Sequence, residues 1–199
     1  MALLAQFVEA VSVVAKRVDG PLIVPWPMPG ALGGFVSFET FGEWLRLVET
    51  LGLGDHVPQI VAAKYIRAQK LLLLSWIDYD LVKAAELVAM TALELALHDR
   101  YATRVKAAYG RVNLAHLLRF MPEHDGLTDD KVAMNRRCGG GTVIGLLTGA
   151  RSPSLAEIRN DGAHGYPFDG FPQSGLIELV RDLIEYAYRD MRPEGSLRA

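Results

Sequence analysis

Apolar residues recur every three or four positions along most of the chain, which is the spacing of one face of an α-helix. This spacing predicts helices over residues 2–16, 40–51, 57–76, 80–104, 111–120 and 174–191. The segment Ser-Leu-Ala-Glu at 154–157 is a capping-box pattern, so we expect a further helix to begin there. The chain has no internal repeat and almost no strand signal. The pattern therefore predicts an all-α fold, an antiparallel helical bundle.

Single residues predict where several of these helices begin and end. Asp80 is a suitable N-cap for the helix over 80–104, and Gly52 ends the helix over 40–51. Pro122 stops the helix over 111–120, because proline cannot donate the backbone hydrogen bond that continues a helix. The three glycines at 139–141 interrupt the chain again.

Residues 19–38 differ from the helical parts, because they carry four prolines and four glycines. These residues break helices, and 22–24 form at most a short edge strand. Trp26, Met28 and Phe35 favour burial, so we expect an ordered apolar loop rather than a flexible linker. The chain thus divides into an N-terminal part, residues 1–56, and a helical bundle, residues 57–192.

Charge and cysteine content narrow the class of protein. With 21 basic and 23 acidic residues the net charge is −2, which gives no overall attraction to nucleic acid. A single cysteine, Cys138, excludes an intramolecular disulfide and a cysteine-based zinc site. His56, His116 and His124 lack partners at metal-ligand spacing, so we expect no metal and no cofactor.

The N-terminal apolar stretch has its basic pair, Lys16 and Arg17, after the apolar residues, which is the reverse of a signal peptide. No apolar run approaches the ~18 residues of a membrane span. These features predict a soluble, cytoplasmic protein without membrane contact.

The densest group of reactive side chains lies at 159–166, where Arg159, Asn160, His164 and Tyr166 follow one another. An Arg binds phosphate through its planar fork, and a His transfers protons near neutral pH. The alternative is an ordinary helix end, in which Arg159 and Asn160 meet the last carbonyls and Gly162 takes the left-handed turn.

Helix geometry sets a condition on the first interpretation. Residues five apart differ by about 140° around a helix axis, so Arg159 and His164 on an unbroken helix do not reach one phosphate. Either Gly162 bends the chain, or a two-fold dimer brings two copies of the segment together.

A helical bundle with Arg-Asn-x-x-x-His near the start of its last third resembles a HEPN domain, a family with an R-x4-6-H signature and commonly a polar residue after the Arg. Residues 84–101, AAELVAMTALELALHDRY, also resemble the preceding long helix of these bundles. The resemblance covers about residues 60–190. It does not account for residues 1–56, which form a Pro/Gly-rich apolar extension, or for an inserted segment at 122–153.

The resemblance implies a homodimeric, metal-independent endoribonuclease that acts on single-stranded RNA, in toxin or defence systems. Arg159 would bind the scissile phosphate and stabilise its transition state. His164 would deprotonate the ribose 2′-OH or protonate the leaving 5′-oxygen, and Asn160 would orient the pair. The expected product is a 2′,3′-cyclic phosphate.

Two further residues are candidates for supporting roles. Arg159, His164 and Tyr166 match the R-x4-H-x-Y form of HEPN toxins that are paired with a nucleotidyltransferase antitoxin, in which the tyrosine is modified; the alternative is a buried aromatic residue. Glu94 lies on the helix over 80–104, four residues before His98, so the two could pair on one face. In the functional interpretation Glu94 reaches Arg159 and positions it. The alternative is an exposed residue that forms a salt bridge.

Arg136, Arg137 and Arg151 flank the glycines at 139–141 and precede the motif, so they are candidates for a basic rim that contacts RNA. The alternative is a set of solvated arginines. The Gly-x4-Gly spacing at 140–145 is not a nucleotide-binding loop, because Leu146 stands where the phosphate-binding Lys is required.

A second function, of a different class, is a catalytically inactive HEPN-like module that dimerises or docks a partner. The apolar loop around Trp26 and Phe35 would then supply the interface. The two functions differ in one expectation. An active enzyme places Arg159 and His164 in an accessible cleft, whereas a buried or separated pair favours the binding module.

Overall fold

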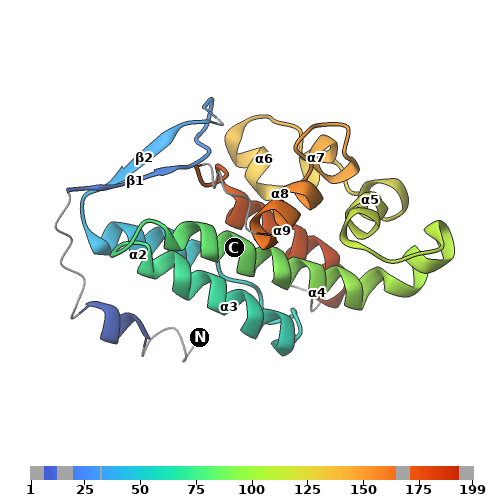
Figure 1. Cartoon of the computed structure of the whole chain (residues 1–199), viewed down its shortest axis with the longest axis horizontal. Coiled ribbons are helices and arrows are strands. Elements are labelled where there is room, and N and C mark those ends of the chain that lie inside the picture. The colour runs from blue at the N-terminus through green and yellow to red at the C-terminus, as the bar shows by residue number, and fades with distance from the viewer. Residues whose placement is uncertain (1–6, 13–19, 32, 165–170, 193–199) are drawn as a thin grey trace.

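The structure is a computed structural model that describes residues 7–12, 20–31, 33–164 and 171–192 (Figure 1). It is mostly helical with a small two-stranded sheet, which confirms the predicted class at that level. Residues 7–12 are helical, and the elements that follow are β1 Leu22–Pro25, β2 Phe35–Phe38, α2 Phe41–Thr50, α3 Gln59–Leu74, α4 Leu81–Tyr109, α5 Leu114–His124, η1 Asp129–Lys131, α6 Ala133–Cys138, α7 Ile144–Thr148, α8 Leu155–Ala163, α9 Leu176–Ala187 and η2 Arg189–Met191.

The core is built around α4, which packs side by side with α3 and also contacts α9 and α5 (Figure 1). Small residues allow this close packing: Ala85, Ala89, Ala92 and Ala96 of α4 are all 0% exposed. The Tyr65 hydroxyl of α3 donates to the Ile177 carbonyl of α9 at 3.1 Å. One cluster of buried apolar residues extends from Leu22 to Tyr188, so the described parts of both predicted segments share a core, and the division at residue 56 stays a prediction.

The segment at 19–38, predicted to be a loop with at most a short edge strand, contains a β-hairpin. β1 and β2 are antiparallel with Leu22 opposite Phe38, and the Trp26 N–H donates to the Gly34 carbonyl at 2.9 Å beyond the strand ends. The second strand was missed because its sequence, Phe-Val-Ser-Phe, lies directly after two glycines and pairs with residues ten to sixteen positions earlier. Trp26 is buried as expected, but Met28 and Phe35 are 44% and 62% exposed, so the expected burial of these two residues is wrong.

The hairpin is held against the helices by aromatic residues. Phe38 of β2 meets Trp44 of α2 edge to face with ring centroids 5.0 Å apart. The Trp44 indole N–H donates to the Leu72 carbonyl of α3 at 2.9 Å. Because Trp44 is 0% exposed, this hydrogen bond also satisfies a buried donor.

The helix ends agree with the sequence in part. Thr40 and Glu43 form a capping box at the start of α2, and Gly139 ends α6 with φ +74°. Asp80 precedes α4, but its side chain makes no cap hydrogen bond. The prediction that Pro122 stops its helix is wrong, since α5 continues to His124. Pro122 lies in the last turn, where its missing N–H removes one helical hydrogen bond near the end.

Within the part of the chain that the structure describes, no helix has the length and apolar character needed to cross a membrane.

Asp125, directly after α5, connects the end of that helix to three other elements. Its Oδ2 accepts from the Tyr101 hydroxyl of α4 and from Arg189 Nη1 of η2, both at 2.7 Å. Its carbonyl accepts from the Tyr186 hydroxyl of α9 at 2.8 Å. Burial acts to raise the pKa of the Asp125 carboxyl, but the hydrogen bonds from Arg189 and Tyr101 outweigh burial and hold this pKa below its usual value.

We expect the contribution of Asp125 to stability to depend on pH. Because its pKa is lower in the folded chain than in the unfolded chain, the ionised carboxylate stabilises the fold above about pH 4, and this stabilisation is lost as the pH falls through the folded pKa. Asp125→Asn should lower the free energy of unfolding by about 1–3 kcal/mol near neutral pH and by less near about pH 3. Urea denaturation at both pH values measures this.

The matched control is Asp55→Asn, which removes one negative charge from an exposed residue. It should leave the free energy of unfolding nearly unchanged at both pH values. A loss in Asp125→Asn that is the same at both pH values would contradict the stabilising role of its charge.

Candidate active site on helix α8

Helix α8 (orange in Figure 1) carries Arg159 and Asn160 and packs on α4 and α5. Its start is fixed as the sequence predicts: the Glu157 N–H donates to Ser154 Oγ at 3.3 Å, and the Ser154 N–H donates to Glu157 Oε2 at 2.7 Å. Leu155 is 0% exposed and anchors the helix in the core. Because Leu155 points into the core, the rotation of α8 about its own axis is fixed, and this rotation decides which of its other side chains face α4.

Arg159 faces α4 and is held there by Glu94. Arg159 Nη2 and Glu94 Oε2 are 2.6 Å apart, and the two side chains are 27% and 32% exposed. Arg159 Nη1 also donates to Asn160 Oδ1 at 3.3 Å. The contact between Glu94 and Arg159 that the functional interpretation requires is thus present, while the positioning role of Glu94 stays a prediction.

The Arg159 guanidinium is not fully satisfied. Its Nε is buried and has no hydrogen-bond partner among the described residues. A buried donor without a partner costs about 1–3 kcal/mol, so it calls for an explanation, such as strain, an ordered water molecule or a catalytic role. Arg159 is therefore fixed in position without being saturated by protein acceptors.

His164 lies at the end of α8 and is exposed. Its backbone N–H donates to the Asn160 carbonyl at 2.9 Å, so the helical hydrogen-bond pattern continues up to this residue. Gly162 lies inside the helix, which ends at Ala163, so the idea that Gly162 turns His164 back toward Arg159 is wrong. The left-handed turn at Gly162 that the helix-end interpretation assumed is also absent, since its φ is not positive.

The unbroken helix separates the two candidate catalytic side chains. Arg159 and His164 differ by about 140° around the axis of α8, and Arg159 is directed toward Glu94. One chain therefore does not place both side chains on one phosphate. The sequence offered two ways to bring Arg159 and His164 together, a bend at Gly162 or a two-fold dimer. Because α8 has no bend at Gly162, only the dimer is left.

The three arginines of the predicted RNA rim have different surroundings. Arg137 makes a bidentate ion pair with Glu178, with hydrogen bonds of 3.0 and 2.6 Å, and also donates to the Pro27 carbonyl. RNA would have to displace these partners. Its pKa is raised, chiefly by the hydrogen bonds to Glu178. Arg136 and Arg151 are exposed, and they line different clefts. The RNA-binding role of all three stays a prediction.

Tyr166 lies outside the described residues. Among the residues that are described, no group of three His, Cys, Asp or Glu side chains is arranged to hold a metal ion. Cys138 is buried, and burial is the main cause that raises the pKa of its thiol.

Sequence reasoning missed a group of basic residues at the end of α9. Arg189, in η2, and Arg192, directly after it, share a cleft with Lys131 and Arg136, which are more than fifty residues earlier. The three-residue spacing of Arg189 and Arg192 was a visible signal. Their meeting with η1 and α6 was not, because it depends on how the helices pack.

Comparisons of the chain with protein-family models, with curated proteins and with solved structures each find no match. The resemblance to HEPN domains therefore rests on the residues of α4 and α8 described above.

Proposed function

We propose that this protein is a HEPN-like, metal-independent endoribonuclease that cleaves single-stranded RNA as a homodimer. The observation that supports this most is the place of Arg159: Glu94 holds it at 2.6 Å, while 27% of its side chain stays exposed. Asn160 and an exposed His164 lie on the same short helix. A toxin or defence role is what the HEPN resemblance adds.

In this proposal each side chain has a distinct task. His164 takes the proton of the ribose 2′-OH, and the 2′-oxygen attacks the adjacent phosphorus. Arg159 stabilises the charge that builds up on the phosphate oxygens, and Asn160 keeps the guanidinium oriented through the contact at 3.3 Å. The bond to the 5′-oxygen breaks, this oxygen takes a proton from solvent water, and His164 returns the proton of the 2′-OH to solvent. The products are a 2′,3′-cyclic phosphate and a free 5′-OH.

The site needs a second copy because one chain directs Arg159 and His164 apart. Arg159 keeps 27% of its side chain exposed, and His164 is exposed at the helix end. A two-fold axis near α8 would bring Arg159 of one copy toward His164 of the other. The active protein is then a dimer, and an isolated chain is inactive.

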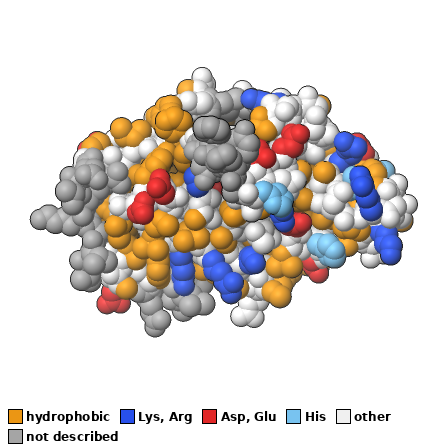
Figure 2. All heavy atoms as spheres, viewed as in Figure 1, with side chains coloured by type: hydrophobic (Ala, Val, Ile, Leu, Met, Phe, Trp, Pro, Cys, Tyr) orange, Lys and Arg blue, Asp and Glu red, His pale blue; other side chains and the backbone are white. Residues whose placement is uncertain are grey.

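A second candidate function is a catalytically inactive HEPN-like module that binds a partner, and the separation of Arg159 from His164 within one chain favours it. Its interface would differ from the one expected from the sequence, because Trp26 is only 7% exposed. Phe35 and Ile23, 62% and 52% exposed, are the apolar residues that the hairpin offers instead, and Figure 2 shows hydrophobic side chains gathered over this part of the molecule. An antitoxin or nucleotidyltransferase is a partner that the resemblance suggests.

Incubation of labelled single-stranded RNA with the wild-type protein in EDTA tests the first function. We expect cleavage to persist in the chelator and the 5′ fragments to end in a 2′,3′-cyclic phosphate. An RNA with a single 2′-deoxy ribose at the mapped cleavage position should resist cleavage there, because it lacks the nucleophile. Cleavage that stops in EDTA, or that proceeds past the 2′-deoxy position, would exclude the proposed chemistry.

A further inference from the structure

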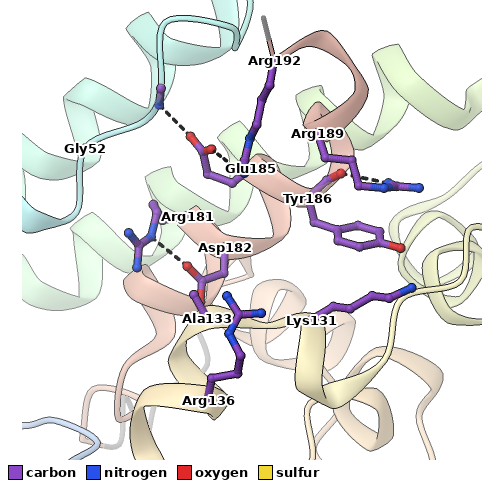
Figure 3. Close-up of a pocket in the computed structure, with 11 residues that line it drawn as sticks. Gly52, Lys131, Ala133, Arg136, Arg181, Asp182, Glu185, Tyr186, Arg189 and Arg192 are labelled. Atoms are coloured by element: carbon purple, nitrogen blue, oxygen red, sulfur yellow. Dashed lines mark hydrogen bonds and ion pairs between the residues drawn. The ribbon is translucent and has the colours of Figure 1, made fainter. Parts of the chain in front are cut away.

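A cationic cleft lies between the end of α9 with η2, the residues around α6, and the segment at Gly52 and Gly54 (Figure 3). Its volume is about 620 Å³, within the range of small-molecule sites. Five of its lining residues are cationic and two are acidic: Lys131, Arg136, Arg181, Arg189, Arg192, Asp182 and Glu185. This is a concentration of positive charge in a chain whose net charge is −2.

Three of the five cations are held in place by carboxylates. Arg181 Nε lies 2.8 Å from Asp182 Oδ1, and Arg192 Nη2 lies 2.8 Å from Glu185 Oε2. Arg189 is paired with Asp125, outside the lining, at 2.7 Å, and its guanidinium lies over the Tyr186 ring. These pairs, of which Figure 3 draws those of Arg181 with Asp182 and of Arg192 with Glu185, give the cleft a fixed polar wall.

Lys131 and Arg136 are in a different state. Lys131 donates to the Gly126 carbonyl at 2.6 Å, and Arg136 donates to the Asp130 carbonyl at 2.8 Å. Neither makes an ion pair within the part of the chain that the structure describes. The pKa of the exposed Asp130 carboxyl is lowered, chiefly by the hydrogen bond with the Thr128 side chain and to a smaller extent by the charges of Lys131 and Arg136. In Figure 3, Arg136 points from α6 toward Asp182 and Arg181.

Two cations with only backbone partners, next to a wall of fixed arginines, are suited to a ligand with several negative oxygens. Arg binds phosphate through two parallel hydrogen bonds, and Lys binds it as a point charge. The cleft is also much larger than one phosphate group. We propose that it binds a small ligand with two or more phosphate groups, such as a nucleoside diphosphate. This inference does not depend on the proposed ribonuclease function.

Isothermal titration calorimetry with inorganic phosphate, pyrophosphate and ADP tests the inference on the full chain. We expect pyrophosphate and ADP to bind more tightly than inorganic phosphate, and all affinities to fall as salt rises. The double variant Lys131→Ala/Arg136→Ala should weaken ADP binding at least about tenfold, since it removes both cations that lack carboxylate partners. The matched control, Arg67→Ala/Lys106→Ala, removes the same charge from exposed positions on α3 and α4 and should bind ADP like the wild type.

Several results would overturn the inference. These are no binding of pyrophosphate or ADP, binding that is insensitive to salt in the wild type, unchanged binding in the double variant, or an equal loss in the control pair. A short single-stranded RNA is the last probe. If it binds through Lys131 and Arg136 while pyrophosphate and ADP do not, the cleft is an RNA contact and the small-ligand inference is wrong.

Discussion

Replacing Arg159 with Ala is expected to lower the rate of RNA cleavage in EDTA by about 10²–10³-fold, and His164→Ala by about 10²–10⁴-fold. Arg159→Ala removes the only side chain that we expect to stabilise the negative charge of the transition state. His164→Ala removes the proton-transfer group. Initial rates on a labelled RNA, at matched protein concentration, measure both effects.

Arg159→Lys sharpens this prediction, because it keeps the positive charge but loses the planar fork. We expect it to remain strongly impaired, since a point charge does not replace two aligned donors. Arg67→Ala, which removes an exposed arginine of α3, is the matched control and should cleave at the wild-type rate. Cleavage that persists in both Arg159→Ala and His164→Ala would show that the catalytic residues do not lie on α8.

Gly175→Ala is expected to destabilise the fold by about 2–5 kcal/mol, a large part of the stability of a domain. Gly175 precedes α9 with φ +69°, a left-handed conformation that costs about 1–2 kcal/mol for residues with a Cβ. A Cβ there would lie 2.5 Å from Pro27 Cγ and 2.9 Å from Met134 Sδ. The Pro27 ring is rigid and cannot easily move aside. The cost of the left-handed backbone conformation and the cost of the steric overlap therefore add.

Urea denaturation measures this effect, with Gly162→Ala as the matched control. Gly162 lies inside α8, and a Cβ there would meet only Leu87 Cδ1, at an ordinary 3.9 Å. Since glycine is unfavourable within a helix, Gly162→Ala should be neutral or stabilise the fold by up to about 1 kcal/mol. A Gly175→Ala variant as stable as the wild type would show that Pro27 and Met134 do not lie against Gly175 as they do in the structure.

Local sequence signals predicted the helical elements well. The Ser154–Glu157 capping box starts α8, and the apolar spacing located α3, α4 and α9 to within a few residues at most ends. Both signals act between residues that are close in sequence, so they can be read without the fold. The hairpin was missed because Phe35–Phe38 becomes a strand only through its partner at Leu22–Pro25.

One contact of the candidate site, between Glu94 and Arg159, was predictable, and the geometry of the site was not. The sequence indicated the contact between Glu94 and Arg159 because both residues had a place in one HEPN-like arrangement. It did not show whether Gly162 would bend the chain, since a glycine inside a helix and one at a helix end are alike in sequence. The cationic cleft depends on the packing of η1, α6 and α9, which no local pattern encodes.

Complementation between two inactive variants tests whether a second copy of the chain completes the site on α8. Arg159→Ala and His164→Ala are unfolded together, refolded as a one-to-one mixture and assayed on single-stranded RNA in EDTA. If Arg159 of one copy acts with His164 of the other, half of the dimers are mixed and each holds one intact site, so activity should return to about a quarter of the wild-type level. A mixture as inactive as each variant alone would contradict the claim.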